Sequence, residues 1–226
     1  MVDNIARLAL RYPILPLATL MPLFLIMMIR IKRIPLERDL KFVYWFCIFF
    51  FITDLPLWIT TGLKINNRDY YFFRELGIQL FLISTNYYLI HSERKKKNIL
   101  ILVSGLALFG IGSYFVARHF NKPAPTEITS ICRLFLIFII LMHFHNIMSK
   151  QKIRNISNYP FFWIYSGVLI LSSGSVLIFL FFEYTISLTI VTLFKLFTQY
   201  LDVLVILMFI FMGIGFLKAK KYYLNE

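Results

Sequence analysis

Long runs of apolar residues, separated by short polar segments, follow one another seven times along the chain. A helix needs about 20 apolar residues to cross the hydrocarbon core of a bilayer, and each run is close to that length. The pattern therefore predicts an all-α integral membrane protein, in which residues 1–226 form a single transmembrane domain folded as a seven-helix bundle. The predicted spans cover approximately residues 14–31, 41–62, 70–90, 98–118, 127–147, 161–183 and 188–217.

The composition supports a membrane protein. Hydrophobic residues make up 59% of the 226 residues and charged residues only 15%. A soluble domain is only about half apolar and needs charge on its surface. The charged residues here come in short runs between the apolar blocks, which leaves no sizeable soluble domain.

The distribution of charge predicts the orientation. A net charge of +13 would suggest nucleic-acid binding in a soluble protein, but the basic residues cluster at the ends of the apolar runs. Loops after the first, third and fifth spans, with the C-terminal tail, hold 15 of the 24 Lys and Arg residues, and the opposite side holds six. The positive-inside rule then places the N-terminus outside and the C-terminus in the cytoplasm. The expected partner is the lipid bilayer, with anionic headgroups at its cytoplasmic face, and not nucleic acid.

Small residues mark two spans as surfaces for close helix packing. In the span 98–118 they are Ser104, Gly105, Gly110, Gly112 and Ser113. In the span 161–183 they are Ser166, Gly167, Ser172, Ser173, Gly174 and Ser175. These serines lack the strand, turn and helix context of a nucleophile elbow, which argues against catalysis by them.

The last span contains three polar residues in an apolar sequence. Lys195, Gln199 and Asp202 are spaced i, i+4 and i+7, so they project from one side of a helix. An ionisable group in a membrane span costs a few kcal/mol or more, and it is normally turned toward protein or water. The stripe therefore predicts a functional site along this helix.

Four other predicted spans also contain ionisable or amide side chains: Asp54, Arg74, Glu75, Gln79, Arg133 and Glu183. The predicted orientation places the charged ones in the outer half of the membrane. In the functional interpretation they line an outward-facing ligand-binding cavity, where the basic residues hold an anionic group and the acidic residues are their partners or proton acceptors. In the alternative interpretation they form an internal ion-pair network that fixes the order of the helices and binds nothing.

No cofactor is predicted. A lysine in the last helix suggests a retinal Schiff base, but microbial rhodopsins carry an aspartate one turn earlier, and that position is Val191 here. His143 and His145 are two residues apart and point away from each other, whereas a metal-binding pair on a helix needs a spacing of three or four. No metal site is therefore predicted.

The entry to the sixth span resembles a family of small orphan bacterial seven-helix proteins, which is similar to the sensor modules found ahead of histidine kinases. The matching positions are Pro160, Phe162, Trp163, Ser166 and Gly167, with Glu75 near the start of the third span and Asn66 and Asn67 before it. The resemblance implies a multi-pass protein of the bacterial inner (cytoplasmic) membrane with a sensory or accessory role. Because only YYLNE follows Lys221, a signal would need a separate partner protein.

Three functions are compatible with this pattern. The first is a membrane sensor or ligand-binding protein that signals through its inner loops or a partner. The second is a small-solute transporter with a three-plus-one-plus-three layout of helices. The third is an intramembrane lipid-acting enzyme that uses the buried carboxylates as acid and base, although no nucleophile or metal pattern supports it.

Overall fold

The computed structural model describes residues 14–63, 65–89, 93–122, 124–149, 156–181 and 191–224. Within these residues the chain is all α-helical apart from one 3₁₀ turn, η1, at Ile156–Asn158. The seven α-helices are α2 (Ile14–Ile31), α3 (Arg38–Gly62), α4 (Arg68–Leu89), α5 (Glu93–His119), α6 (Glu127–Ser149), α7 (Pro160–Leu180) and α9 (Val191–Leu224).

The helices follow the predicted spans, and the largest differences lie at helix ends. Helix α9 continues to Leu224, past the predicted end at residue 217, because the lysine-rich sequence after Gly215 contains no residue that stops a helix. Helix α5 likewise begins in the charged segment at Glu93. Helix α7 begins with Pro160 at its first position, as predicted, but ends at Leu180, where the Phe181 N–H donates to the Leu177 carbonyl.

Five of the described helices are long and apolar enough to cross a membrane, so the chain is a helical membrane protein with several candidate spans. They are α3, α5, α6, α7 and α9. The apolar part of α2, Pro16–Ile31, is shorter than the other five. Helix α4 carries Arg68, Asp69, Arg74 and Glu75 in its first two turns, and its crossing of the membrane stays a prediction, as does that of α2.

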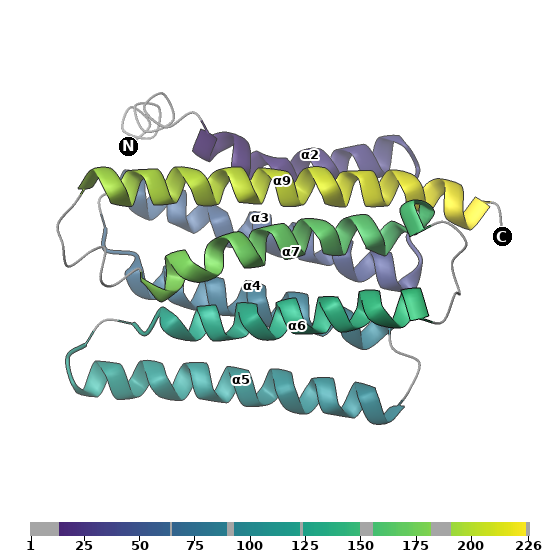
Figure 1. Ribbon diagram of the computed structural model, residues 1–226. Helices are drawn as coiled ribbons and strands as arrows, with labels where there is room; N and C mark the ends of the chain where they lie inside the picture. Colours follow the sequence, from purple (N-terminus) through teal and green to yellow (C-terminus); the bar gives the residue numbers. More distant parts are fainter. Residues whose placement is uncertain are drawn as a thin grey trace.

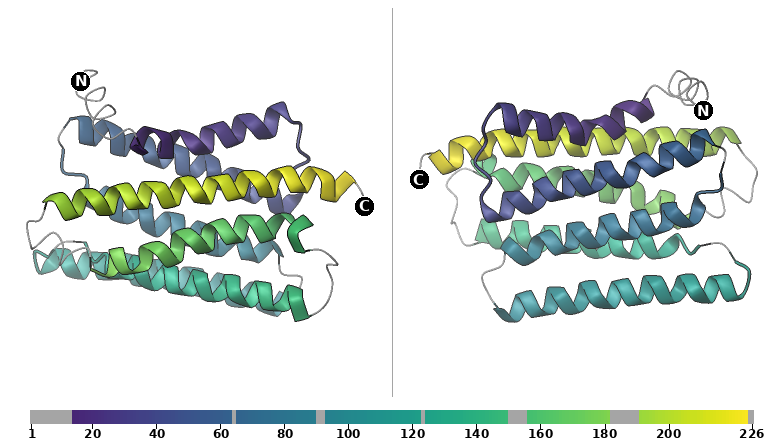
Figure 2. Two further views of the ribbon diagram at one scale, coloured as in Figure 1. Left: turned by 45° about the horizontal axis from the view of Figure 1, so that its top comes forward. Right: turned by 180° about the vertical axis from the view of Figure 1, so that it is seen from behind.

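Six of the helices form a closed ring. Going around it, α2 contacts α3, α3 contacts α4, α4 contacts α6, α6 contacts α7, α7 contacts α9, and α9 returns to α2. Helix α5 lies outside this ring against α4, at the edge of the bundle in both Figure 1 and Figure 2. Successive helices run antiparallel (Figure 1), so α4 and α7 also run in opposite directions. The order around the ring therefore follows the order in the sequence, with α5 left out of it.

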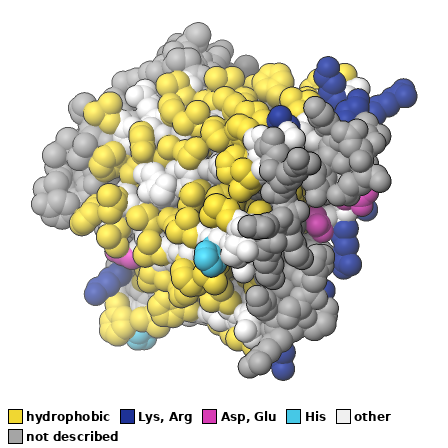
Figure 3. Space-filling model, turned by 45° about the vertical axis from the view of Figure 1, so that its right-hand side comes forward, with side chains coloured by type: hydrophobic (Ala, Val, Ile, Leu, Met, Phe, Trp, Pro, Cys, Tyr) yellow, Lys and Arg dark blue, Asp and Glu magenta, His cyan; other side chains and the backbone are white. Residues whose placement is uncertain are grey.

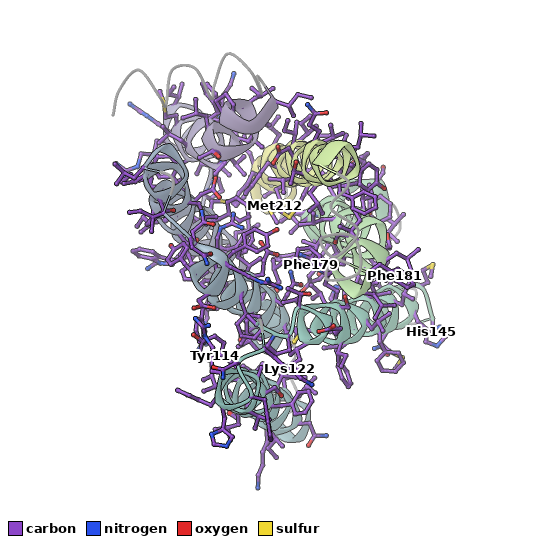
Figure 4. All side chains as sticks on the ribbon, turned by 90° about the vertical axis from the view of Figure 1, so that its left-hand side faces the viewer. Tyr114, Lys122, His145, Phe179, Phe181 and Met212 are labelled. Atoms are coloured by element: carbon purple, nitrogen blue, oxygen red, sulfur yellow. The ribbon has the colours of Figure 1, made fainter. Side chains whose placement is uncertain are left out.

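Apolar and aromatic side chains fill the ring. In the end-on view of Figure 4, Phe179 and Met212 point toward the interior, while His145 lies on the outside; Phe179 and Met212 are buried. Aromatic contacts join neighbouring helices, for example the edge-on contact of Phe50 on α3 with Phe209 on α9, whose ring centroids are 5.1 Å apart. The interior is thus a packed core in which a charged group is exceptional.

The tightest helix contact in the ring joins α7 to α9. A Cβ added at Gly167 would lie 2.8 Å from the Met208 carbonyl oxygen, and one added at Gly174 would lie 2.8 Å from Leu204. At Gly167 the atom met belongs to the backbone of α9, so only glycine allows the two backbones to approach this closely. The predicted packing surface on the sixth span is therefore confirmed at these two residues.

The corresponding prediction for the fourth span is wrong at two of its glycines. Among the described residues, no atom lies within 4 Å of a Cβ added at Gly105 or Gly112, whereas one added at Gly110 would meet Leu76 of α4. The reason is the position of α5: it has one main neighbour in the described structure, so most of its circumference contacts no other helix. Small residues permit close packing but do not create a neighbour.

The outside of the bundle is apolar along the helices and basic at one end. Figure 3 shows a largely hydrophobic face, with most dark-blue Lys and Arg side chains along its right-hand edge. Exposed basic side chains of the described residues at the end where α2 and α9 finish are Arg30, Lys32, Arg33, Arg38, Lys41, Lys97 and Lys220. At the opposite end they are Arg118 and Lys122.

Candidate functional site: a buried charge network

Helix α4 places two consecutive charged residues between its two neighbours in the ring. Successive residues of an α-helix point about 100° apart, so Arg74 reaches toward α3 while Glu75 reaches toward α6. An Arg74 Nη2 atom lies 2.6 Å from Asp54 Oδ1 on α3. The other Asp54 oxygen accepts a hydrogen bond from the Thr19 hydroxyl on α2. One carboxylate therefore ties α2, α3 and α4 together.

The other half of the network crosses from α4 to α7 through α6. Arg74 Nη1 lies 2.6 Å from Glu75 Oε1. The second Glu75 oxygen accepts from Arg133 Nη2 on α6 at 2.6 Å. Arg133 Nη1 then donates to the Ser175 hydroxyl on α7 at 2.5 Å. The connected chain of six side chains thus joins five of the six helices of the ring.

All four charged groups in this chain are withdrawn from the surface. Arg133 is 2% exposed and Glu75 6% exposed, and Asp54 and Arg74 are each 9% exposed. Removing an ion from water costs several kcal/mol, which pairing and hydrogen bonding must offset. Two guanidinium groups face two carboxylates here, so the four charges balance.

Aromatic rings cover the two guanidinium groups. The Arg74 Cζ atom lies 4.7 Å from the ring centroid of Phe50, and Arg133 Cζ lies 4.4 Å from that of Phe179. Such cation–π contacts contribute more when the cation is desolvated. The rings also keep each guanidinium plane in place, because Phe50 and Phe179 are themselves buried.

Asp202 on α9 brings a further carboxyl group to the same level, within electrostatic range of Asp54 and Arg74. It is half-buried, and among the described residues it forms no hydrogen bond or ion pair. Asp202 therefore places a carboxyl group of the sixth ring helix beside the network.

Several polar atoms around the network are buried without a hydrogen-bond partner in the described structure. They are both amide atoms of Gln79, the hydroxyl of Ser172, and the Nε atoms of Arg74 and Arg133. Buried polar groups in proteins are nearly always hydrogen-bonded, so each exception needs an explanation. Five of the eight such atoms in the described structure lie around this network.

The structure brings together four of the predicted site residues: Asp54, Arg74, Glu75 and Arg133. Asp202 lies beside them, and Gln79 lies one turn along α4 from Glu75. Gln199 is half-buried on α9 and has no hydrogen bond to the network among the described residues. The side chain of Lys195 and all of Glu183 lie outside the described residues.

The sequence did not reveal that Thr19 and Ser175 take part in the network, or that Ser172 lies one turn of α7 from it. A hydroxyl residue in an apolar helix usually donates to a carbonyl of its own helix, as Ser166 does to Phe162. Its presence in a sequence therefore gives no sign of an interhelical role. The one available signal was position, because Ser172 and Ser175 are three residues apart and share a face of α7.

The described histidine and cysteine side chains take no part in the hydrogen bonds or ion pairs of this network. His143 packs against Tyr165, with ring centroids 4.9 Å apart, in the opposite half of α6 from Arg133. Cys47 and Cys132 are buried free thiols. Among the described residues, no group of three or more His, Cys, Asp or Glu side chains is arranged to hold a metal ion.

Comparisons of the chain with protein-family models, with curated proteins and with solved structures give no match.

Proposed function

We propose that this protein is a membrane sensor that binds a small polar ligand at the buried charge network and passes the signal on through a change in helix arrangement. The observation that carries this proposal is the incomplete hydrogen bonding around the network. A network that serves only to hold helices together is stable when every buried polar group is satisfied. Here the amide of Gln79 and the hydroxyl of Ser172 are fully buried and unpartnered in the described structure.

The way the network joins the helices supports a signalling role. One connected set of side chains links α2, α3, α4, α6 and α7. Asp202 of α9 lies within electrostatic range of two of its members, Asp54 and Arg74. A ligand that exchanged one of these contacts for its own would change the balance between two helix arrangements. It acts only if it binds the two arrangements with different affinity.

The direction of the signal follows from the predicted orientation. With the N-terminus outside, the network lies in the outer half of a bacterial inner membrane, and the ligand enters from the outside. The basic end of the bundle then faces the cytoplasm and its anionic headgroups. A separate signalling protein at these inner loops would receive the change, in keeping with the resemblance to sensor modules of histidine kinases.

Thermal unfolding of the purified protein with a panel of small solutes tests the proposal. The panel contains amino acids, dicarboxylates, polyamines, amides and polyols. We expect one class to raise the unfolding temperature of the wild type, and the rise to disappear in Asp202→Asn and Arg133→Gln. Arg118→Gln is the matched control, since Arg118 is exposed at the end of α5, and it should keep the response.

A distance measurement separates sensing from simple binding. Spin labels at positions 41 and 97, both exposed lysines at the basic end of the bundle, should report a shift between α3 and α5 when the stabilising solute is added. Absence of stabilisation by every class, or equal stabilisation of the wild type and of both network variants, would contradict the proposed function.

A further inference from the structure

Gln79 and Ser172 are the two most deeply buried polar side chains that lack a partner. Each has 0% of its surface exposed. The Gln79 amide nitrogen and oxygen and the Ser172 hydroxyl form no hydrogen bond to any described residue. They belong to different helices, α4 and α7, so the question is whether they lie at the same level of the bundle.

The contacts between α4 and α7 answer it, because they fix how the two antiparallel helices align. Three such contacts are Tyr71 with Phe179 (ring centroids 6.2 Å apart), Glu75 with Ser175 through Arg133, and Thr85 with Tyr165 through a hydrogen bond. In all three, the position rises along α4 as it falls along α7. The alignment is therefore constant along the length of the pair.

In this alignment Gln79 lies at the same level as Ser172. Gln79 is four residues after Glu75, and Ser172 is three residues before Ser175. Each step is one helical turn, and because the helices are antiparallel both steps lead to the same side of Arg133. The two side chains thus occupy the level between the Arg133 bridge and the Thr85–Tyr165 hydrogen bond. Hydrogen bonds join α4 to α7 at the levels on either side, whereas at this level the described residues form no such bond.

The chemistry at this level determines what could complete it. An amide offers two donors and an acceptor, and a hydroxyl offers one donor and accepts as well. Arg133 and Glu75 neutralise each other one turn away, and the α6 residue one turn from Arg133 is the fully buried Leu136. A charged occupant would have no counter-ion here and would pay a large desolvation cost. A neutral molecule that both donates and accepts meets the requirement.

We propose that Gln79 and Ser172 form a binding site for one small uncharged molecule with hydrogen-bond donor and acceptor groups, held between α4 and α7. Water and a small hydroxyl- or amide-bearing solute share this chemistry. If the molecule is a solute, it is the ligand of the proposed function, and this inference then names the ligand class and rests on that function. If the molecule is water, the site does not depend on the proposed function, because internal waters commonly satisfy otherwise unpartnered buried groups.

A double-mutant cycle on thermal unfolding tests the site. The variants are Gln79→Met, Ser172→Ala and the combination of both. If one molecule bridges the two side chains, each single change breaks the same bridge, and each lowers the unfolding temperature by about 2 to 4 °C. The double variant should then lose no more than the larger single loss. Ser173→Ala is the control, since the exposed Ser173 hydroxyl donates to Leu169 of its own helix at 2.7 Å, and it should change nothing.

If no molecule occupies the site, the substitutions should change the unfolding temperature in the opposite direction. Removing an unsatisfied buried polar group relieves a cost, so both single variants would be unchanged or more stable, and their effects would add. That result would overturn the proposal.

Acetamide and ethylene glycol distinguish the two sources of the ligand. A rise in the unfolding temperature of the wild type but not of Gln79→Met identifies a solute site. A preserved coupling with no response to either solute identifies water. If the effects of the Gln79 and Ser172 substitutions are coupled but no compound of the ligand panel stabilises the wild type, the proposed function is wrong and the binding site stands. The two proposals therefore fail separately.

Discussion

Helix α5 and the six-helix ring are built from similar apolar sequence but occupy different surroundings. On α5, Leu108 is 72% exposed and Phe115 65% exposed, whereas on α7, Val168 and Phe179 are each 1% exposed. The polar contacts differ in the same way. Arg118 of α5 pairs with Asp69 at the surface, while Arg133 of the ring pairs with Glu75 in the interior.

The difference shows where function can reside in a bundle of this kind. A lipid-facing helix such as α5 needs only apolar side chains and one contact surface, which Tyr114 supplies by stacking on Phe72 of α4. Burying charges costs the ring stability, but it brings together a set of polar contacts that no single helix can make. We therefore assign the site to the ring and a supporting role to α5.

Breaking the charge network should have the largest effect. Arg133→Leu leaves Glu75 with one of its two arginine partners and removes the donor to Ser175, and losing one partner of a buried pair typically costs about 3–5 kcal/mol. The double variant Glu75→Gln with Arg133→Leu should recover part of this loss, because no uncompensated charge remains. Chemical or thermal unfolding of the wild type, of Arg133→Leu and Glu75→Gln separately, and of the double variant checks this. A double variant less stable than either single variant would contradict the pairing.

The helix pattern explains how much of this could be predicted from the sequence. Runs of apolar residues specify helices, and the structure follows them within a few residues at most ends. Depth along a helix also follows from spacing, so Asp54, Glu75 and Arg133 could be assigned to one level. The neighbours of each helix could not, because α5 and α6 are both apolar on most sides and nothing in their sequences says which of them enters the ring.

The partners within the site were out of reach for the same reason. Arg74 and Glu75 are adjacent, yet one points to α3 and the other to α6, which depends on the order of helices around the ring. The roles of Ser175 and Thr19 could not be predicted, because they depend on which helices these two residues face. The predicted anionic ligand also loses support, since both guanidinium groups are already matched by carboxylates.

Glycine substitutions should have the next largest effect on stability, and the loss should be greater in the ring than on α5. Gly167→Leu places side-chain atoms against the Met208 carbonyl and the Phe211 side chain, and overpacking of this kind costs about 1–3 kcal/mol. A Cβ added at Gly105 on α5 meets no atom of the described residues within 4 Å, so Gly105→Leu should leave stability nearly unchanged. Unfolding temperatures of the two variants, measured side by side, would refute the comparison if they fell equally.

The surface ion pair of α5 should have the smallest effect. Arg118 and Asp69 are both solvent-accessible, and exposed ion pairs contribute little because water and salt screen them. We expect Arg118→Gln and Asp69→Asn to leave the unfolding temperature unchanged within error, at low and at high salt. A clear loss in either variant would show that α5 is anchored more firmly than its exposure indicates.

A high-resolution density map of the purified wild-type protein in a lipid environment tests the central claim most directly. The account predicts the Arg133 side chain inside the ring, between Glu75 and Ser175, with non-protein density between Gln79 and Ser172. An Arg133 side chain that extends toward the lipid headgroups, or a Gln79 amide that bonds directly to Ser172 with no additional density, would contradict it.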